Sequence, residues 1–321
     1  MNSQVLLSTV NRWGLIAATL ITVLAIFGDR FLYADSAFFF VKQLELGGYF
    51  LNDPARFFAQ ILSQTPLQLS LALGLENLTV LGKVYGSTLF LMPLLSLFLC
   101  QLLIKDQRIL LLPMLSFFVA TMPAYAFIVS EAHVMLAAFW VLMALLLKAE
   151  SLSRAEMVFA ALLAALAAYS YESALFLNPL LIAILMWRWA KLAGRFRSFW
   201  AVAMLSLLLL GILVAGNSIL HPRDANNESQ FLESVFVLLR SSHYVWLLVP
   251  VSVGSLVLAL RGWVPTQTQM LSCMALGAVT VGLALSMWPQ LSDIHLSYKA
   301  RVLLLLIPVG LMLLAWLFHK F

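Results

Sequence analysis

Two carboxylates follow the first long apolar stretch of the chain, in the sequence GDRFLYADSAFF at positions 28–39. Asp29 and Asp35 are six residues apart, which on a straight helix turns their side chains about 240° away from each other. A break between them is therefore needed before both can act on one substrate. Asp35 can cap a helix over 36–46, which the two following glycines would end, and one oxygen of a capping carboxylate stays free for chemistry. Asp29 can instead form an ion pair with the arginine that follows it.

Further polar groups fall in two short turns between apolar segments. The turn SEAH (130–133) carries Glu131 and His133, and the turn YSYES (169–173) carries Tyr171 and Glu172. In exposed turns such groups are simply solvated, and tyrosines are common in the aromatic belt of a membrane interface. In turns sunken towards the bundle interior they are candidates for a substrate-binding site. Glu172 has no basic residue near it in the sequence, so we expect its partner to come from elsewhere in the fold.

Two cations precede the last apolar segment, in LSDIHLSYKARVLLLL (291–306). Lys299 and Arg301 can extend to lipid headgroups, which is the usual arrangement of such residues. Alternatively they bind a phosphate, which the paired N–H groups of a guanidinium fit well. The carboxylates elsewhere in the chain favour a phosphate for Arg301 and leave Lys299 undecided.

The composition identifies the solvent of this protein. Its 321 residues are 63% hydrophobic and only 10% charged, with a mean hydropathy of +0.98, whereas soluble domains have about a quarter of their residues charged. Lipid must therefore cover much of the surface, and the net charge of +5 reflects loop asymmetry, with no nucleic acid as partner. The sequence lacks the usual motifs of soluble enzymes. Both cysteines, Cys100 and Cys273, lie in apolar stretches, which argues against a disulfide framework, a zinc site or a thiol nucleophile.

Hydropathy predicts an all-α transmembrane bundle of about ten spans. The stretch 157–189 is either one long helix or two short ones that meet at YSYES; two spans keep the basic residues on its flanks on one side of the membrane. The predicted spans are 13–27, 87–104, 109–129, 134–147, 157–169, 174–189, 199–220, 243–260, 270–287 and 302–318. Both termini are then cytoplasmic, with eleven of the nineteen basic residues on the same side: Arg12, Lys105, Arg108, Lys148, Arg154, Arg188, Lys191, Arg195, Arg197, Arg261 and Lys320.

The region 28–86 is predicted to be the first extracytoplasmic region of a single membrane domain that covers 1–321. Pro54 and Pro66 each follow a residue that can cap a helix, which predicts two further short helices after the one over 36–46. Phenylalanines beside isolated charges are typical of helices that lie in the plane of the membrane interface. A second segment of this kind is FLESVFVLLR (231–240).

This layout resembles the GT-C superfamily of membrane glycosyltransferases over roughly the first 190 residues. The matching segments are YADSAFFFVKQLELGGYF (33–50), in the position of the acidic loop motif, followed by SEAH and YSYES. Members of that superfamily carry an essential acid just after the first span, and juxtamembrane helices in the same loop. Many have their acids closely paired, whereas Asp29 and Asp35 are separated, so the sequence leaves open whether a divalent metal takes part.

The resemblance implies transfer of a sugar from a polyprenyl-phosphate-linked donor to a glycan or lipid acceptor, on the extracytoplasmic face of a bacterial inner membrane, in cell-envelope polysaccharide biosynthesis. It implies Asp35 as the base that deprotonates the acceptor, and Arg301 with Lys299 on the leaving phosphate. Substrate binding would then fall to the remaining candidates: Asp29, Glu131, His133, Tyr171 and Glu172. The rival hypotheses are a transporter or flippase for a lipid-linked saccharide, a non-catalytic subunit of a polysaccharide assembly complex, and a membrane acyl or phosphoryl transferase. We see no symmetry between chain halves of the kind common in transporters.

Overall fold

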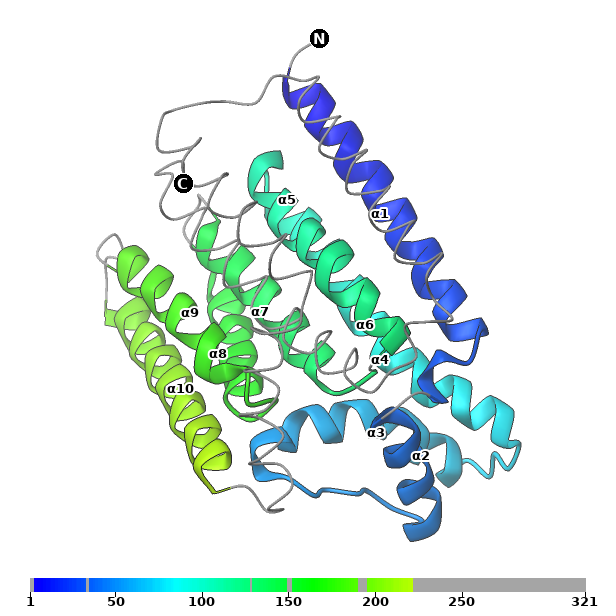
Figure 1. Ribbon diagram of the computed structural model, residues 1–321. Helices are drawn as coiled ribbons and strands as arrows, with labels where there is room; N and C mark the ends of the chain where they lie inside the picture. Colours follow the sequence, from blue (N-terminus) through cyan, green and yellow to red (C-terminus); the bar gives the residue numbers. More distant parts are fainter. Residues whose placement is uncertain (1–2, 33–34, 128, 149–151, 190–194, 222–321) are drawn as a thin grey trace, which may run out of the picture.

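The structure, a computed structural model, describes residues 3–32, 35–127, 129–148, 152–189 and 195–221. Within these ranges every regular element is helical (Figure 1), in agreement with the predicted all-α class. The elements are α1 (Ser3–Phe27), η1 (Arg30–Leu32), α2 (Asp35–Leu46), η2 (Pro54–Arg56), α3 (Phe57–Ala72), α4 (Leu78–Leu103), α5 (Gln107–Ser116), η3 (Phe117–Thr121), α6 (Met122–Phe127), α7 (Ala132–Leu147), α8 (Arg154–Ala168), α9 (Ala174–Trp189) and α10 (Arg195–Leu220). The last three predicted spans, the segment 231–240, and both Lys299 and Arg301 lie outside the described residues.

Three of the described helices are long and apolar enough to cross a membrane. These are Leu7–Phe27 within α1, Leu78–Leu103, which is α4, and Phe199–Leu220 within α10. A helix rises about 1.5 Å per residue, so the 26 residues of α4 exceed the roughly 30 Å of a bilayer core. α7 and α9 are also apolar, but each has only 16 residues. These lengths are compatible with an integral membrane protein, and the total of about ten spans stays a prediction.

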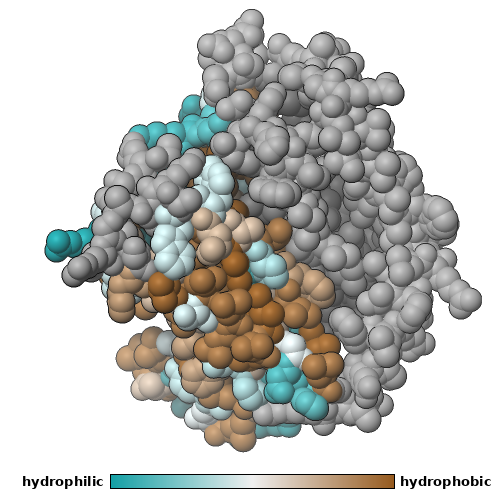
Figure 2. Space-filling model, turned by 90° about the vertical axis from the view of Figure 1, so that its left-hand side faces the viewer, coloured by the Kyte–Doolittle hydropathy of each residue, from teal (hydrophilic) through white to brown (hydrophobic). Residues whose placement is uncertain are grey.

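Exposed apolar side chains mark the surface that suits lipid. Along α1, the side chains of Trp13, Leu20, Leu24 and Phe27 form one stripe, and each residue is 58% to 70% exposed. α10 exposes a comparable set that includes Leu213. Figure 2 shows the face that lies on the left of Figure 1, where apolar residues dominate the coloured surface. A soluble protein rarely exposes so much contiguous apolar area.

α7 is the central helix of the bundle. Its residues from Ala132 to Leu146 are all buried, because α4 packs against one side of it and α8 and α9 pack against others. α10 lies on α8 and α9, and α1 lies on α4 and α5 (Figure 1). α2 and α3 lie across the end of the bundle at the bottom of Figure 1, which we call the α3 end.

The two ends of the bundle differ in charge. At the end opposite α3, Lys148 Nζ lies 2.6 Å from Glu156 Oε1, and Arg188 Nη1 donates a hydrogen bond to the Leu146 carbonyl at 2.7 Å. Both cations belong to the set predicted to be cytoplasmic. The turns that carry the candidate acids, 130–131 and 169–173, lie at the α3 end. The structure thus separates the two groups of residues as the sequence predicted.

The break at YSYES is confirmed, because α8 ends at Ala168 and α9 begins at Ala174. The prediction of a new helix at Pro66 is wrong: α3 runs through this proline. A proline inside a helix removes one backbone hydrogen bond. In α3 the hydroxyl of Thr65, next to this proline, bonds to the Ile61 carbonyl at 2.7 Å.

The second predicted span, 87–104, begins too late, since α4 starts at Leu78. Asn77 caps this helix, with its Oδ1 accepting from the N–H groups of residues 79 and 80 at 3.0 and 3.2 Å. Lys83, in the part of α4 that precedes the predicted span, places its Nζ 5.5 Å from the centre of the Phe27 ring. Such a contact makes a cation acceptable near the start of an apolar helix.

Candidate functional site

An ion pair joins α3 to the bundle at the α3 end. Arg56 Nε lies 3.0 and 3.2 Å from the two carboxylate oxygens of Glu172, and its Nη2 lies 2.8 Å from Oε1. Asp53 positions the arginine, because its Oδ1 caps the short helix η2 by accepting from the Ala55 N–H at 2.8 Å. Both charged side chains are only about 20% exposed. The partner that the sequence required for Glu172 is therefore Arg56.

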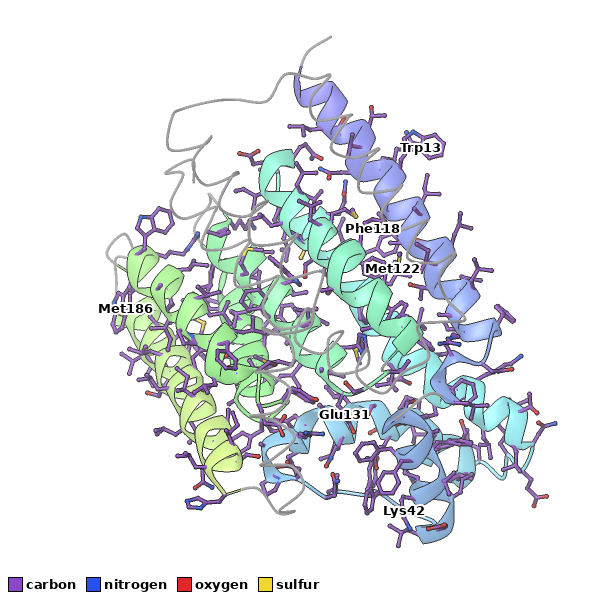
Figure 3. The ribbon with its side chains drawn as sticks, in the orientation of Figure 1. Trp13, Lys42, Phe118, Met122, Glu131 and Met186 are labelled. Atoms are coloured by element: carbon purple, nitrogen blue, oxygen red, sulfur yellow. The ribbon has the colours of Figure 1, made fainter. Side chains whose placement is uncertain are left out.

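Two more predicted residues adjoin this arginine. The Arg56 guanidinium lies 4.6 Å from the centre of the Tyr171 ring, in cation–π geometry. Burial lowers the pKa of Arg56, but the charges of Tyr171, Glu172 and Glu131 oppose burial and leave this pKa above its ordinary value. Glu131 is 1% exposed and immediately precedes α7, where the helix dipole favours a negative charge. Figure 3 shows it at the lower end of the bundle beside α3.

His133 lies in the first turn of α7 and is fully buried. Its Nδ1 lies 2.8 Å from the Ser130 carbonyl, and because a carbonyl only accepts, Nδ1 carries the hydrogen. The neutral ring then presents a lone pair at Nε2, for which no hydrogen-bond partner exists among the described residues. The ring of Tyr125 lies against the imidazole, with 5.4 Å between centres, and its hydroxyl is held by the Phe90 carbonyl at 3.0 Å.

The backbone of α2 joins the same region. α2 begins at Asp35, and the N–H of Ser36 donates to the Val129 carbonyl at 3.2 Å, next to the SEAH turn. The expected helix start and the stop at Gly47, where φ is +61°, are confirmed. The side chain of Asp35 lies outside the described residues. The hydrogen bond of the next residue, Ser36, nevertheless joins the Asp35 backbone to the segment that leads to Glu131.

Asp29 occupies a different position. It lies just after the end of α1, with φ of +52°, a conformation that commonly ends helices and that aspartate tolerates better than most residues. The neighbouring Arg30 donates from Nε to the Tyr125 carbonyl at 3.4 Å. Phe31 then packs on Gly82 and Gly86 of α4. These contacts give Asp29 a structural position at the end of α1, and none of them links it to Arg56.

Several buried polar atoms at the α3 end, where the Arg56–Glu172 ion pair lies, have no hydrogen-bond partner among the described residues. Such atoms are uncommon in folded proteins and normally await water, an ion or a ligand. They come from the start of α2, from α3 and from the two polar turns, and each of their residues is 1% exposed or less: Ser36 Oγ, Gln60 Oε1, Ser130 Oγ, His133 Nε2 and Ser173 Oγ.

Sequence reasoning missed Arg56 and assigned it to an interfacial helix. The sequence did offer a signal, because few basic residues in this region could be the partner of Glu172. Between positions 29 and 104 the only ones are Arg30, Lys42, Arg56 and Lys83. Of the predicted site residues, the structure brings Glu131, Tyr171 and Glu172 to one arginine, with His133 next to Glu131 in the same turn. In the part of the chain that the structure describes, no three histidine, cysteine or acidic side chains gather as metal ligands.

α3 also holds an irregular segment, residues 48–52, which we call the strap. Gln64 bonds both backbone groups of Phe50, accepting from its N–H at 2.8 Å and donating to its carbonyl at 2.9 Å. Gln68 donates to the Gly48 carbonyl at 3.0 Å, and Gln60 donates to the Asn52 side chain. The three glutamines are four residues apart on α3, and their partners are two residues apart on the strap. These spacings match, because four residues of helix advance about 6 Å and two residues of extended chain about 6.6 Å.

Comparisons with known protein families, with curated proteins and with solved structures find no match to this chain.

Proposed function

We propose that this protein is an integral membrane glycosyltransferase that moves a sugar from a polyprenyl-phosphate-linked donor to a glycan or lipid acceptor. The observation that carries the proposal is the partly buried ion pair of Arg56 and Glu172, with the buried Glu131 beside it, at one end of an apolar bundle next to the start of α2. Ionisable residues that a fold withdraws from water are costly and are therefore candidates for functional sites. The partnerless polar atoms around them add hydrogen-bonding capacity that a sugar would use.

The proposed reaction places Asp35 as the general base. Its carboxylate takes the proton of the acceptor hydroxyl as that oxygen forms a bond to the anomeric carbon of the donor sugar. The bond from this carbon to the phosphate oxygen breaks, and the polyprenyl phosphate leaves as an anion. Lys299 and Arg301 are proposed to stabilise that anion.

The separation of charge along the bundle supports a proposed orientation for the site. Basic residues concentrate at the end opposite α3, and such residues favour the cytoplasmic side of a membrane. We therefore place the α3 end on the extracytoplasmic face of a bacterial inner membrane, with both termini in the cytoplasm. The lipid tail of the donor would lie between helices, and its sugar would meet the site at the membrane boundary.

The test replaces the proposed base in cells that depend on this gene product. Lipid-linked and surface glycans are compared by mass spectrometry between wild type, a deletion strain and Asp35→Asn. The expected result is loss of the same glycan in the variant and in the deletion, with normal amounts of folded protein in the membrane. The matched control is Glu45→Gln, on the same helix, because its 54% exposed side chain forms only a surface pair with Lys42.

Two results would contradict the proposal. A normal glycan profile in Asp35→Asn would remove this residue as the base. In proteoliposomes, movement of a lipid-linked saccharide between leaflets without a new glycosidic bond would identify a transporter.

A further inference from the structure

Three of the partnerless atoms belong to one connected piece of structure. The N–H of Ser36 bonds to the carbonyl of Val129, and the residue after Val129 is Ser130, whose own carbonyl accepts from His133 Nδ1. Ser36 Oγ, Ser130 Oγ and His133 Nε2 are all buried and have no hydrogen-bond partner within the described ranges. A buried polar group without a partner loses its hydration and gains nothing in return. Three such atoms, one at the start of α2 and two in the turn 130–133 to which α2 is bonded, indicate that a ligand supplies the missing bonds.

The chemistry of these atoms restricts the ligand. Nε2 of a ring whose Nδ1 holds the hydrogen can only accept, so the ligand must bring a donor. The serine hydroxyls can donate or accept and therefore suit another hydroxyl. The turn also contains the buried carboxylate of Glu131, which disfavours a phosphate at this position. The one described cation next to Glu131 is Arg56, and Glu172 already occupies two of its nitrogens.

We propose that Ser36, Ser130 and His133 form a subsite for an uncharged hydroxyl-bearing group, a sugar ring, with one ligand hydroxyl donating to His133 Nε2. The choice of a sugar among hydroxyl-bearing groups rests on the proposed function. The subsite binds the sugar of the donor or acceptor, and the phosphate of a donor binds elsewhere.

The imidazole is held ready for this role. The Ser130 carbonyl fixes its Nδ1, and the Tyr125 ring fixes its plane. Tyr125 is itself fixed by Phe90, and it follows a π-helical turn, η3, of a kind that often lies near functional sites. A pre-oriented acceptor loses less entropy on binding than a mobile one, which favours selectivity for the geometry of the ligand hydroxyl.

The test measures sugar binding to the full chain in lipid nanodiscs by saturation-transfer NMR, without any transfer reaction. The probes are a panel of methyl hexosides and methyl pentosides, with inorganic phosphate as the anionic alternative. His133→Phe keeps the aromatic contact with Tyr125 but removes the acceptor, and we expect roughly three- to tenfold weaker binding of the best sugar. His133→Gln places an amide oxygen near the position of Nε2 and should recover part of the affinity. Ser130→Ala tests the neighbouring hydroxyl with little risk to folding.

The control is Ser96→Ala in α4, where the hydroxyl is buried but already bonded to the Pro93 carbonyl at 2.7 Å. It should leave sugar binding unchanged. The inference is overturned if no sugar of the panel binds, if phosphate binds in place of the sugars, or if His133→Phe and Ser130→Ala both bind as tightly as wild type. Glycan transfer that survives such a result leaves the proposed function standing, whereas sugar binding without transfer refutes the proposed function alone.

Discussion

The environment of the Arg56–Glu172 ion pair predicts that replacing the arginine lowers the free energy of unfolding more than replacing the glutamate. Arg56→Gln leaves the carboxylates of Glu172 and Glu131 without their shared cation. Removing one partner of a buried pair costs about 3–5 kcal/mol, and we expect about 3 kcal/mol because each side chain keeps about 20% exposure. Glu172→Gln instead leaves Arg56 beside Glu131 and supplies an amide oxygen as acceptor. Its cost should be about 1–2 kcal/mol, below the roughly 1.5–3 kcal/mol of hydrogen bonds to a charged group, because the amide oxygen keeps one contact to the arginine.

The assay is the free energy of unfolding in mixed micelles, titrated with dodecyl sulfate and followed by tryptophan fluorescence. Arg56→Lys separates charge from geometry, since an ammonium cannot bond two carboxylate oxygens through a planar fork, and it should fall between wild type and Arg56→Gln. The control is Lys42→Gln, which breaks an exposed pair with Glu45 and should cost less than about 1 kcal/mol. Equal losses for Arg56→Gln and Glu172→Gln would refute the shared-cation argument. Losses no larger than that of Lys42→Gln would refute the burial argument as well.

Three further outcomes test the helix contacts. Gly86→Ala places a methyl group 2.6 Å from the Cβ of Phe31, so it should destabilise by about 1–3 kcal/mol, whereas Gly216→Ala meets no atom within 4 Å and should be neutral or gain up to about 1 kcal/mol. The hydrogen bond from Lys148 lowers the pKa of Glu156 from 4.5 to about 2, so its contribution to stability is complete above about pH 4.5 and is lost as the pH falls towards 2; Lys148→Met should flatten that part of the pH profile of thermal unfolding. Gln64→Leu removes both bonds to the strap, and hydrogen exchange should rise within residues 48–52 but not in α7.

The results that would contradict these outcomes are distinct. Equal stability of the two alanine variants would mean that Phe31 moves away from Gly86 without a cost in free energy. An unchanged acid profile in Lys148→Met would remove the lysine as the cause of the lowered pKa. Unchanged exchange in Gln64→Leu would mean that other contacts hold the strap.

The sequence predicted the separation of the polar turns from the basic end because both follow from local signals. The apolar stretches give the helices, and the basic flanks of 157–189 require two short helices instead of one. The failures came from residues whose effect depends on neighbours. Pro66 normally starts a helix, but α3 tolerates it at the cost of one hydrogen bond. The predicted span 87–104 begins too late, because α4 also includes Lys83, whose charge lies against an aromatic ring from α1.

The sequence predicted four acids for the candidate site, of which the structure brings Glu131 and Glu172 to one arginine and leaves Asp29 apart, and it could not predict their geometry. Glu172 required a cation, yet sequence could not choose among the eight basic residues outside the predicted cytoplasmic set, because the choice depends on how η2 meets the turn after α8. The backbone bond from the Phe58 N–H to the Tyr169 carbonyl, 2.9 Å long, fixes that meeting. Contacts of this kind join residues far apart in the chain and leave no local pattern.

Because the glutamines of α3 contact every second residue of the strap, the effect of an insertion depends on whether the number of inserted residues is odd or even. Gly48, Phe50 and Asn52, every second residue of the strap, meet the helix amides, the first two through backbone groups, while the Tyr49 hydroxyl lies 3.1 Å from that of Thr65 on the same helix. Inserting one residue into the strap would break this alternation and leave at least one of the three glutamines without its contact. Inserting two would restore the alternation and only lengthen the connection. Tolerance of insertions here should therefore depend on parity more than on size.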